Sequence, residues 1–312
     1  MKSFFKNKKV FITGHTGFKG IWLVTILSFF GAKIYGYSKK DSTTKNYKKL
    51  CKGLKVTDCF GDILDKKKLN KKLKEIKPEI IIHFAAQSLV QESYKTPAKT
   101  INTNVIGTTN LLESCRSINS IKAILIATSD KCYENNNNKN TYFSENYKLG
   151  GDDPYSASKA CKEIIFNAYL KSFYSNKKIG LASVRAGNVI GGGDWSENRI
   201  IPDCARSIIL KKKMILRNPK SIRPWQHVLD VLRGYLILVK KLYLEKNKTK
   251  FNNSYNFGPN DKKKYNVSYI VDKFFKILDT NKNIIIFKKK DPKKEKKILL
   301  LNSNKSKRIL KW

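Results

Sequence analysis

Short apolar runs rich in β-branched residues alternate with longer apolar or amphipathic segments along the first 190 residues. Residues 9–13, 33–37, 179–184 and a run that begins at Ile80 are of the first kind, and residues 21–30 and 155–173 are of the second. Strands that alternate with helices in this way form a parallel sheet covered by helices on both faces. The pattern therefore predicts an α/β fold, a Rossmann-like doubly wound parallel sheet.

The turn between the first strand and the first helix is rich in glycine. It reads Gly14-His-Thr-Gly17-Phe-Lys-Gly20, a spacing different from the G-x-G-x-x-G of two-domain dehydrogenases. Glycine lets the backbone approach a pyrophosphate closely, and the amino end of the following helix favours that anion. We therefore expect a dinucleotide site. The residues predicted to contact the dinucleotide are Gly14, Thr16, Gly17, Phe18, Gly20, Ser38, Asp62, Ile63, Phe84, Ala85 and Ala86.

The end of the second strand bears on the identity of the dinucleotide. The chain continues there as Ser38-Lys39-Lys40, and the first acidic residue is Asp41. An acidic side chain at this place would accept hydrogen bonds from the ribose 2′-hydroxyl, whereas two lysines tolerate a 2′-phosphate. We expect NAD, and NADP stays open. Further on, Asp62 is placed to meet the adenine amino group, and His83 is either a strand-end histidine with satisfied hydrogen bonds or a residue near the dinucleotide.

Tyr155 and Lys159 stand four residues apart in the segment Tyr-Ser-Ala-Ser-Lys. On a helix these positions share one face, so the ammonium can favour the ionised form of the phenol. A phenolate beside an ammonium suits removal of a hydroxyl proton while hydride leaves the same carbon, which is the oxidation of an alcohol by a nicotinamide. Both residues are therefore predicted to be catalytic and to contact the cofactor.

The length of 312 residues allows a large dinucleotide domain with a smaller appended lobe. We expect an NAD-binding domain over residues 1–187, with a return near 226–261. A smaller, discontinuous α/β substrate lobe is expected over 188–225 and 262–312. The glycine-rich loop from Asn188 to Asp203 is too long for a plain connection, and such loops usually bind ligands.

The formal net charge of +40 comes almost entirely from lysines scattered along every segment. Binding of nucleic acid would instead favour arginines interleaved with aromatic side chains, so we expect no nucleic-acid partner. The six cysteines show no C-x-x-C spacing, which argues against a metal site. The longest apolar run has ten residues, residues 21–30, and no leader pattern precedes the first strand. We therefore expect a cytoplasmic protein without a membrane partner.

Three further motifs carry a family resemblance. They are Thr128-Ser-Asp-Lys-Cys-Tyr133, Arg185-Ala-Gly-Asn188-Val-Ile-Gly-Gly-Gly-Asp-Trp195 and Arg223-Pro-Trp-Gln-His-Val-Leu-Asp230. With the glycine turn, Asp62-Ile63, Tyr155 and Lys159, the chain resembles the extended short-chain dehydrogenase/reductases that modify nucleotide sugars, over nearly its whole length. Within them it is similar to the 4,6-dehydratases. Where dTDP-glucose dehydratases have Thr-Asp-Glu, this chain reads Ser129-Asp130-Lys131, which points to CDP-glucose as the substrate.

The resemblance implies NAD-dependent loss of water from a nucleotide-activated hexose, giving a 4-keto-6-deoxy sugar for deoxysugar and O-antigen-type polysaccharides. It implies that Tyr155 takes the C4 hydroxyl proton and that Ser129 bonds the C4 oxygen. Asp130 and Lys131 are then candidates for the acid and the base of the elimination, with their division left open. The predicted substrate-binding residues are Gln87, Asn188, Trp195, Arg199, Arg223 and Asp230.

Rival interpretations share much of this pattern. A nucleotide-sugar 4-epimerase would have the same Tyr155 and Lys159 but needs no acid–base pair for C5 and C6, and a dehydratase of another nucleotide sugar would keep both. A catalytically idle dinucleotide-binding or nucleic-acid-binding protein is a more remote alternative. The resemblance also implies a further helix beyond residues 310–312, so we expect a shortened substrate lobe. By analogy of fold, residues 111–115 and 155–173 form a dimer face, which predicts a homo-oligomer, a dimer or a tetramer.

Overall fold

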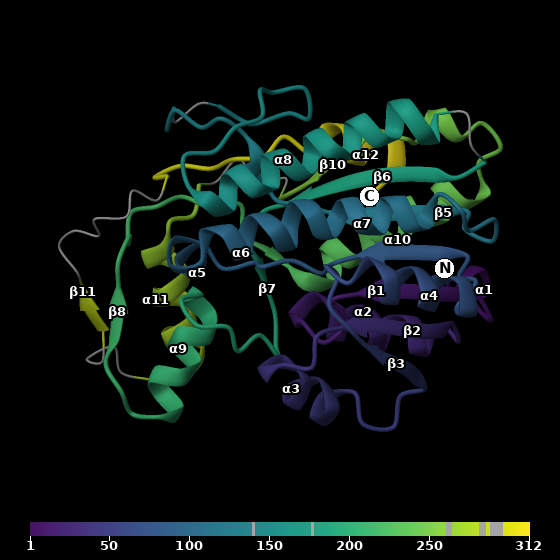
Figure 1. The fold of residues 1–312 in the computed structure, drawn as a ribbon. Coiled ribbons are helices and arrows are strands. Elements are labelled where there is room, and N and C mark those ends of the chain that lie inside the picture. The colour runs from purple at the N-terminus through teal and green to yellow at the C-terminus, as the bar shows by residue number, and fades with distance from the viewer. Residues whose placement is uncertain (139–140, 176–177, 260–263, 281–284, 288–295) are drawn as a thin grey trace.

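A parallel sheet forms the centre of the computed structural model, which describes residues 1–138, 141–175, 178–259, 264–280, 285–287 and 296–312 (Figure 1). Its seven strands are β1 (Lys9–Thr13), β2 (Lys33–Ser38), β3 (Val56–Phe60), β4 (Ile80–His83), β5 (Ala123–Ala127), β6 (Gly180–Ala186) and β10 (Ser254–Phe257). The helices around the sheet are α1 (Lys2–Phe5), α2 (Phe18–Phe29), α3 (Ser42–Leu50), α4 (Lys66–Ile76), α5 (Val90–Lys95), α6 (Pro97–Ile101), α7 (Gly107–Cys115), α8 (Pro154–Tyr169), α10 (Val228–Leu244) and α12 (Asn304–Leu310).

The strand order is β10-β6-β5-β4-β1-β2-β3, and every neighbouring pair is parallel. The chain begins in the middle at β1, runs to the edge at β3, and then returns to build the other half from β4 onward. This order confirms the predicted doubly wound sheet. In such sheets ligands bind beyond the carboxyl ends of the strands where the order reverses, which here is between β1 and β4.

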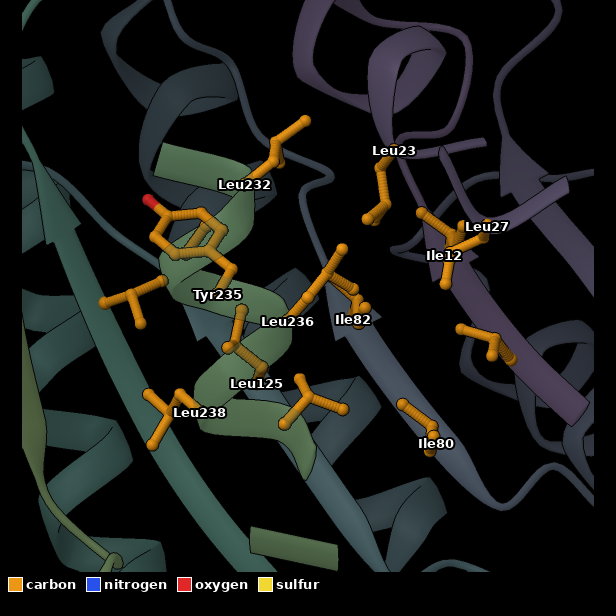
Figure 2. Packing of buried hydrophobic residues seen from close by; sticks show 14 of the residues in the cluster. Ile12, Leu23, Leu27, Ile80, Ile82, Leu125, Leu232, Tyr235, Leu236 and Leu238 are labelled. Carbon is orange, nitrogen blue, oxygen red and sulfur yellow. The ribbon is translucent and has the colours of Figure 1, made fainter. Parts of the chain in front are cut away.

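Alternate residues of the strands face two separate cores. Val10 and Ile12 point to the face covered by α2 and α10, whereas Phe11 belongs to the cluster under α4, α7 and α8. Figure 2 shows Leu236 of α10 lying near Ile82 in the first of these cores. A fully buried leucine or isoleucine side chain contributes about 1.5–3 kcal/mol, so these two faces hold the sheet and its helices together.

Element boundaries follow the apolar pattern closely in the first half of the chain. Strand β1 has the predicted bounds, and β2 is one residue longer than predicted. Helix α2 begins at Phe18, three residues before the predicted apolar stretch, because Gly17 is its N-cap. Helix α8 ends at Tyr169 and continues as a π-helical turn over Leu170–Tyr174, so the predicted segment 155–173 is helical but not uniformly α.

A smaller group of elements lies beside the sheet (Figure 1). It consists of α9 (Ile200–Ile209), β8 (Met214–Leu216), α11 (Val267–Ile277) and β11 (Ile285–Phe287), where β8 and β11 pair in parallel. Its own core contains Cys204, Met214, Leu216, Val271 and Phe275. A short ribbon of β7 (Val189–Ile190) and β9 (Gln226–His227) lies where the chain passes between this group and the sheet.

The end of the chain lies with the sheet and not with this lobe. Helix α12 contacts β10 and α10, and its Leu310 is buried in the core under α10. Trp312 adds an edge-to-face contact with Phe257. The expected assignment of 262–312 to the substrate lobe is therefore wrong for residues 304–312, because their apolar side chains complete the main core. Residues 262–263, 281–284 and 288–295 of that range lie outside the described residues.

Among the described residues, no helix has the length and apolar character needed to cross a membrane.

Lys162 of α8 is an exception to the apolar interior. Its side chain is 0% exposed, and its ammonium has no hydrogen-bond partner in the described part of the chain. Burial, together with the like charge of Lys159, holds the pKa of Lys162 well below its usual value. The folded state therefore favours the neutral amine, whereas the unfolded chain carries a proton there up to pH about 10.5.

We predict that Lys162→Met raises the free energy of unfolding at pH 7 by roughly 1–3 kcal/mol, because it removes an unpaired buried polar group. The gain should shrink as the pH rises toward 10, where the unfolded chain also loses the proton. Urea titrations at pH 7 and pH 10 measure both effects. Lys171→Met, at an exposed lysine just beyond the same helix, is the matched control and should change little. An equal or lower stability of Lys162→Met at pH 7 would contradict this account.

Candidate active site

The carboxyl ends of the central strands open into a cavity of about 310 Å³. The loops that follow β4, β5 and β6 contribute to its wall, together with the first turn of α2, the amino end of α8 and part of the smaller lobe. Eleven of the residues singled out from the sequence line it. They are Phe18, Phe84, Ala86, Ser129, Asp130, Lys131, Tyr155, Lys159, Asn188, Arg199 and Arg223.

Tyr155 and Lys159 enter the cavity from the first two turns of α8. Asp153 caps this helix by accepting a hydrogen bond from the backbone N–H of Ser156 (3.0 Å), and Pro154 occupies the first turn. The Lys159 Nζ lies 5.4 Å from the centre of the Tyr155 ring, as the i, i+4 spacing predicts. The helix therefore presents both groups to one point of the cavity.

Burial, and not the neighbouring charge, dominates the protonation of this pair. It raises the pKa of Tyr155 to about 12, although a hydrogen bond with Ser129 acts in the opposite direction. It lowers the pKa of Lys159 to about 7, with the like charge of Lys19 as a further cause. We expected the lysine to bring the phenol pKa down. The pKa of the phenol is raised instead, because loss of hydration on burial is the largest effect on Tyr155.

Ser129, Asp130 and Lys131 follow β5 in a tight turn. The Ser129 Oγ donates to Asp130 Oδ1 (3.0 Å) and accepts from the Lys131 backbone N–H (3.2 Å). Asp130 is 4% exposed, and its Oδ2 has no hydrogen-bond partner within the described chain. Desolvation raises the pKa of Asp130, which is the direction expected for a general acid. Because Ser129 also bonds the phenol of Tyr155, a phenol, a hydroxyl and a carboxyl group form one connected row.

The glycine turn packs tightly against the end of β4. Gly14 has φ +73°, and a Cβ atom there would lie 2.6 Å from the backbone nitrogen of Ala85, so only glycine fits. Gly17 then begins α2 as its N-cap, with no side chain over the first N–H groups of the helix. A bare backbone at the amino end of a 12-residue helix suits the pyrophosphate of a dinucleotide.

The adenosine end of the predicted dinucleotide site lies beyond β2 and β3. The Ser38 Oγ is buried and lies 2.7 Å from Nδ1 of His15, whose Nε2 lies 3.1 Å from Asp58 Oδ1. Asp62 pairs with Lys39 (2.6 Å), and Ile63 packs under α7. These residues stand together at the carboxyl edge of the sheet, next to the main cavity and outside its wall.

Two arginines predicted to bind substrate line the cavity while bonded to protein groups. Arg199 donates to Asp194 (2.8 Å) and to Ser88 (3.2 Å). Arg223 donates to the backbone carbonyls of Lys296 (2.7 Å) and Ile222 (2.9 Å). Arg223 therefore holds residues 296–297 at the rim of the cavity. This contact could not be predicted from the sequence, because the residues lie far apart along the chain.

Three predicted substrate-binding residues do not reach the cavity wall. The Gln87 side chain donates to the Leu89 carbonyl in its own loop and to the Thr100 hydroxyl of α6. Trp195 is 45% exposed and Asp230 lies exposed in the first turn of α10. Trp195 and Asp230 share their motifs with Asn188 and Arg223, which do line the cavity. A side chain elsewhere on the same loop or helix can point in another direction.

Lys19 is a cavity residue that we did not predict. It lies in the first turn of α2, and its Nζ stands 5.8 Å from the ring centre of Phe84 and 6.0 Å from that of Tyr235. Burial, with Arg199 nearby, lowers its pKa to about 8, and Asp130 opposes this shift. The available signal was a charged residue between Phe18 and Gly20, where an ordinary helix would bury an apolar side chain.

Fold and site together define an enzyme of the nucleotide-sugar-modifying short-chain dehydrogenase/reductase class. The chain belongs to the GDP-mannose 4,6 dehydratase family, whose model matches residues 11–312. It is 47% identical over 281 residues to the CDP-glucose 4,6-dehydratase of Salmonella typhimurium, covering 87% of this chain and 77% of that one. It is 32% identical to the dTDP-D-glucose 4,6-dehydratase of Dictyostelium discoideum, covering 75% and 56% of the two chains.

A solved structure with the same fold is that of Bacillus anthracis dTDP-glucose 4,6-dehydratase in complex with NAD, which is 24% identical. The match has a TM-score of 0.82 and covers 98% of this chain and 91% of that one. UDP-glucose 4-epimerase from Thermotoga maritima has a TM-score of 0.84 at 20% identity, over 97% and 92% of the two chains. The fold is therefore common to dehydratases and epimerases.

We predict that Asp130→Asn raises the melting temperature at pH 7 to 8. The folded state raises the pKa of Asp130, so its ionised form costs stability above that pKa, roughly 1–3 kcal/mol for an unsatisfied buried group. The gain should disappear as the pH falls below about 4, where both states hold the proton. Thermal scans across this range measure it, with the exposed Glu197→Gln as control. A variant less stable than wild type at pH 7 would show that the carboxylate is stabilising.

Proposed function

We propose that the protein is an NAD-dependent 4,6-dehydratase that converts CDP-glucose to CDP-4-keto-6-deoxyglucose, a hydro-lyase reaction. The observation that carries the proposal is the row of Tyr155, Ser129 and Asp130 in one buried cavity, with Lys131 in the same turn. The choice of CDP-glucose is supported by the 47% identity to the Salmonella enzyme of that activity. The product class belongs to deoxysugar and O-antigen-type polysaccharide synthesis.

The residues at the carboxyl edge of the sheet fit NAD. The glycine turn from Gly14 to Gly20 would hold its pyrophosphate, Asp62 and Ile63 would border its adenine, and Lys159 would bond its nicotinamide ribose. When bound, NAD supplies the oxidation of C4 and the later reduction of C6. The presence of NAD in the Bacillus anthracis dTDP-glucose 4,6-dehydratase structure supports it over NADP.

The first proton moves at the C4 hydroxyl. Tyr155 takes it as the phenolate, and the Ser129 hydroxyl bonds the C4 oxygen as the ketone forms. Burial disfavours the phenolate, so its formation depends on groups that stabilise negative charge. Lys159, whose Nζ is 5.4 Å from the ring centre, and the Ser129 hydrogen bond both favour it.

The ketone at C4 makes the C5 proton acidic, and the two adjacent side chains after Ser129 complete the elimination. Lys131 takes the C5 proton, the C6–O bond breaks, and Asp130 gives its proton to the leaving hydroxyl, which departs as water. Burial raises the pKa of Asp130, which is the direction that a proton donor requires. An epimerase has no use for a general acid at this position, and that favours the dehydratase.

A second copy of this chain is proposed as the protein's partner, across the outer faces of α7 and α8. Leu111 and Cys115 are buried against the sheet, so they do not form the expected surface. The exposed apolar side chains of this side are instead Ile106 (47%), at the start of α7, and Ile164 (55%), on α8. Covering them with the same surface of a second copy forms a symmetric dimer.

Purified protein incubated with NAD and CDP-glucose should yield a 4-keto-6-deoxy sugar, detected by its alkali-induced absorbance. dTDP-, UDP- and GDP-glucose in parallel tests should react far more slowly.

Asp130→Asn should still oxidise C4 but lose at least 10²-fold in the rate of water release, because a positioned general acid contributes 10²–10⁴-fold. Full 4-keto-6-deoxy product from this variant would exclude Asp130 as the acid, and release of CDP-galactose by the wild type would identify an epimerase.

Light scattering after size exclusion should give a dimer or a higher even-numbered oligomer for the wild type and a monomer for Ile164→Lys, because a buried lysine at the interface is left unpaired. Ile277→Lys alters another exposed isoleucine, on α11 of the smaller lobe, and should keep the wild-type mass. A monomeric wild type, or the same mass for both variants, would contradict this interface.

A further inference from the structure

A buried ion pair joins α8 to β6 directly behind the cavity. The Arg185 guanidinium donates to the Glu163 carboxylate (2.8 Å), and the two side chains are 2% and 0% exposed. A buried ion pair contributes little to stability compared with well-packed apolar residues, because both charges lose their hydration. Stability alone therefore gives no reason for a charged pair at this place.

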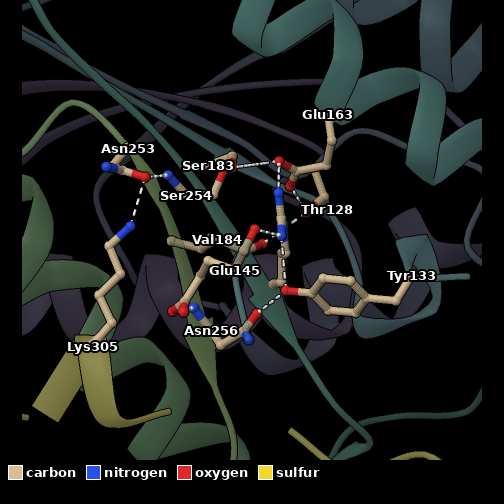
Figure 3. A network of polar contacts seen from close by, with 11 residues as sticks. Thr128, Tyr133, Glu145, Glu163, Ser183, Val184, Asn253, Ser254, Asn256 and Lys305 are labelled. Carbon is tan, nitrogen blue, oxygen red and sulfur yellow. Dashed lines mark hydrogen bonds and ion pairs between the residues drawn. The ribbon is translucent and has the colours of Figure 1, made fainter. Parts of the chain in front are cut away.

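The hydrogen bonds around this pair are nearly complete (Figure 3). The Glu163 carboxylate accepts from the hydroxyl groups of Thr128, Ser183 (2.9 Å) and Ser254 (3.0 Å) as well as from Arg185. Donors from β6, from β10 and from the residue that follows β5 thus hold one carboxylate of α8. Networks with this many bonds specify one arrangement of their elements.

Two attachments of the network lie on either side of the turn Ser129–Lys131. Thr128, which bonds Glu163, immediately precedes Ser129. Tyr133 lies two residues beyond Lys131, and its hydroxyl accepts from Arg185 (2.8 Å). Backbone bonds also hold the ends of the turn, since the Thr128 N–H donates to Val184 (2.9 Å) and the Gly150 N–H donates to Cys132 (2.9 Å). The two side-chain bonds differ from these because they attach both ends to the same ion pair.

Glu163, the acidic member of the ion pair, lies on the same helix as Tyr155 and Lys159. Glu163 lies four residues after Lys159 and eight after Tyr155 on α8, so the three side chains share one face of the helix. The network therefore sets the distance between the groups that α8 presents and the groups that the turn presents.

We infer that Glu163 and Arg185 are positioning residues, which hold the Ser129–Lys131 turn in register with Tyr155 and Lys159 through Thr128 and Tyr133. The effect of this positioning on the reaction rests on the proposed dehydratase function. A displaced turn weakens the contact of Ser129 with the C4 oxygen but leaves Tyr155 and Lys159 in place on α8 for the oxidation. Elimination loses more, because Asp130 and Lys131 both move away from C6 and C5. Loosening either attachment therefore impairs elimination more than oxidation.

The test removes single hydroxyl groups from the network. Tyr133→Phe keeps the stacking of its ring on Phe143 (centroids 5.2 Å apart) and loses only the contact with Arg185 and Asn256. Thr128→Val removes the other attachment. Ser254→Ala is the matched control, because it takes one hydrogen bond from the same carboxylate on the side away from the turn.

Hydrogen–deuterium exchange of the peptide containing residues 129–133 reads the position of the turn without any substrate. Exchange should rise several-fold in Tyr133→Phe and Thr128→Val and stay near the wild-type rate in Ser254→Ala. In single turnovers with CDP-glucose, the two attachment variants should lower the ratio of the elimination rate to the oxidation rate by about tenfold or more, since small displacements cost up to ~10²-fold. Reduced-nicotinamide absorbance reports the oxidised intermediate that accumulates.

The inference is overturned if the three variants exchange alike, or if the attachment variants slow both steps equally. Failure of the wild type to dehydrate any nucleotide sugar would refute the proposed function instead, and the exchange rates would still decide whether the ion pair holds the turn.

Discussion

The parallel alignment of β1, β4, β5 and β6 is the constraint on which the site depends. Because these strands run in one direction, the segments that follow them meet at a single edge of the sheet. The glycine turn, the Ser129–Lys131 turn and the loop from Asn188 come from distant parts of the chain, and this edge brings them together. Two apolar cores hold the strands in register, so the site inherits its geometry from packing that lies outside it.

In the cavity, burial affects the pKa values of the ionisable groups more than neighbouring charges do. Tyr155 and Asp130 have raised pKa values, and Lys159 and Lys19 have lowered ones, and in each case loss of hydration is the largest cause. All four groups are thus shifted toward their neutral forms, which suits proton donation by Asp130 and opposes the phenolate form of Tyr155. The same desolvation makes the site costly for the fold, as the unsatisfied Asp130 Oδ2 shows.

Much of the fold could be predicted because its signals are local. The strand from Lys9 to Thr13 is a run rich in β-branched residues, and the glycine turn after it predicts the start of a helix. The Tyr155–Lys159 pair was equally accessible, since four residues on a helix define one face. The Ser129–Lys131 turn was found through resemblance, and the position of its side chains in the cavity follows from the end of β5.

Other features depend on contacts between distant residues, which no local pattern contains. Arg223 lines the cavity, where it was expected to bind substrate, and it also donates to the backbone carbonyls of residues 296 and 297, a contact that the sequence did not predict. Residues 304–312 were assigned to the substrate lobe because no local pattern shows that α12 packs against β10. The direction of the Tyr155 pKa was also missed, because spacing indicates which charges are near but not how much water they have lost.

The central claim is that the hydrogen removed from C4 of the sugar returns at C6 of the same molecule after water leaves. CDP-glucose carrying deuterium at C4, incubated with the protein and unlabelled NAD, tests this most directly, with the product analysed by nuclear magnetic resonance. The account predicts a 4-keto-6-deoxy product with the deuterium in its C6 methyl group. Deuterium retained at C4, or a product that keeps its C6 oxygen, would contradict it.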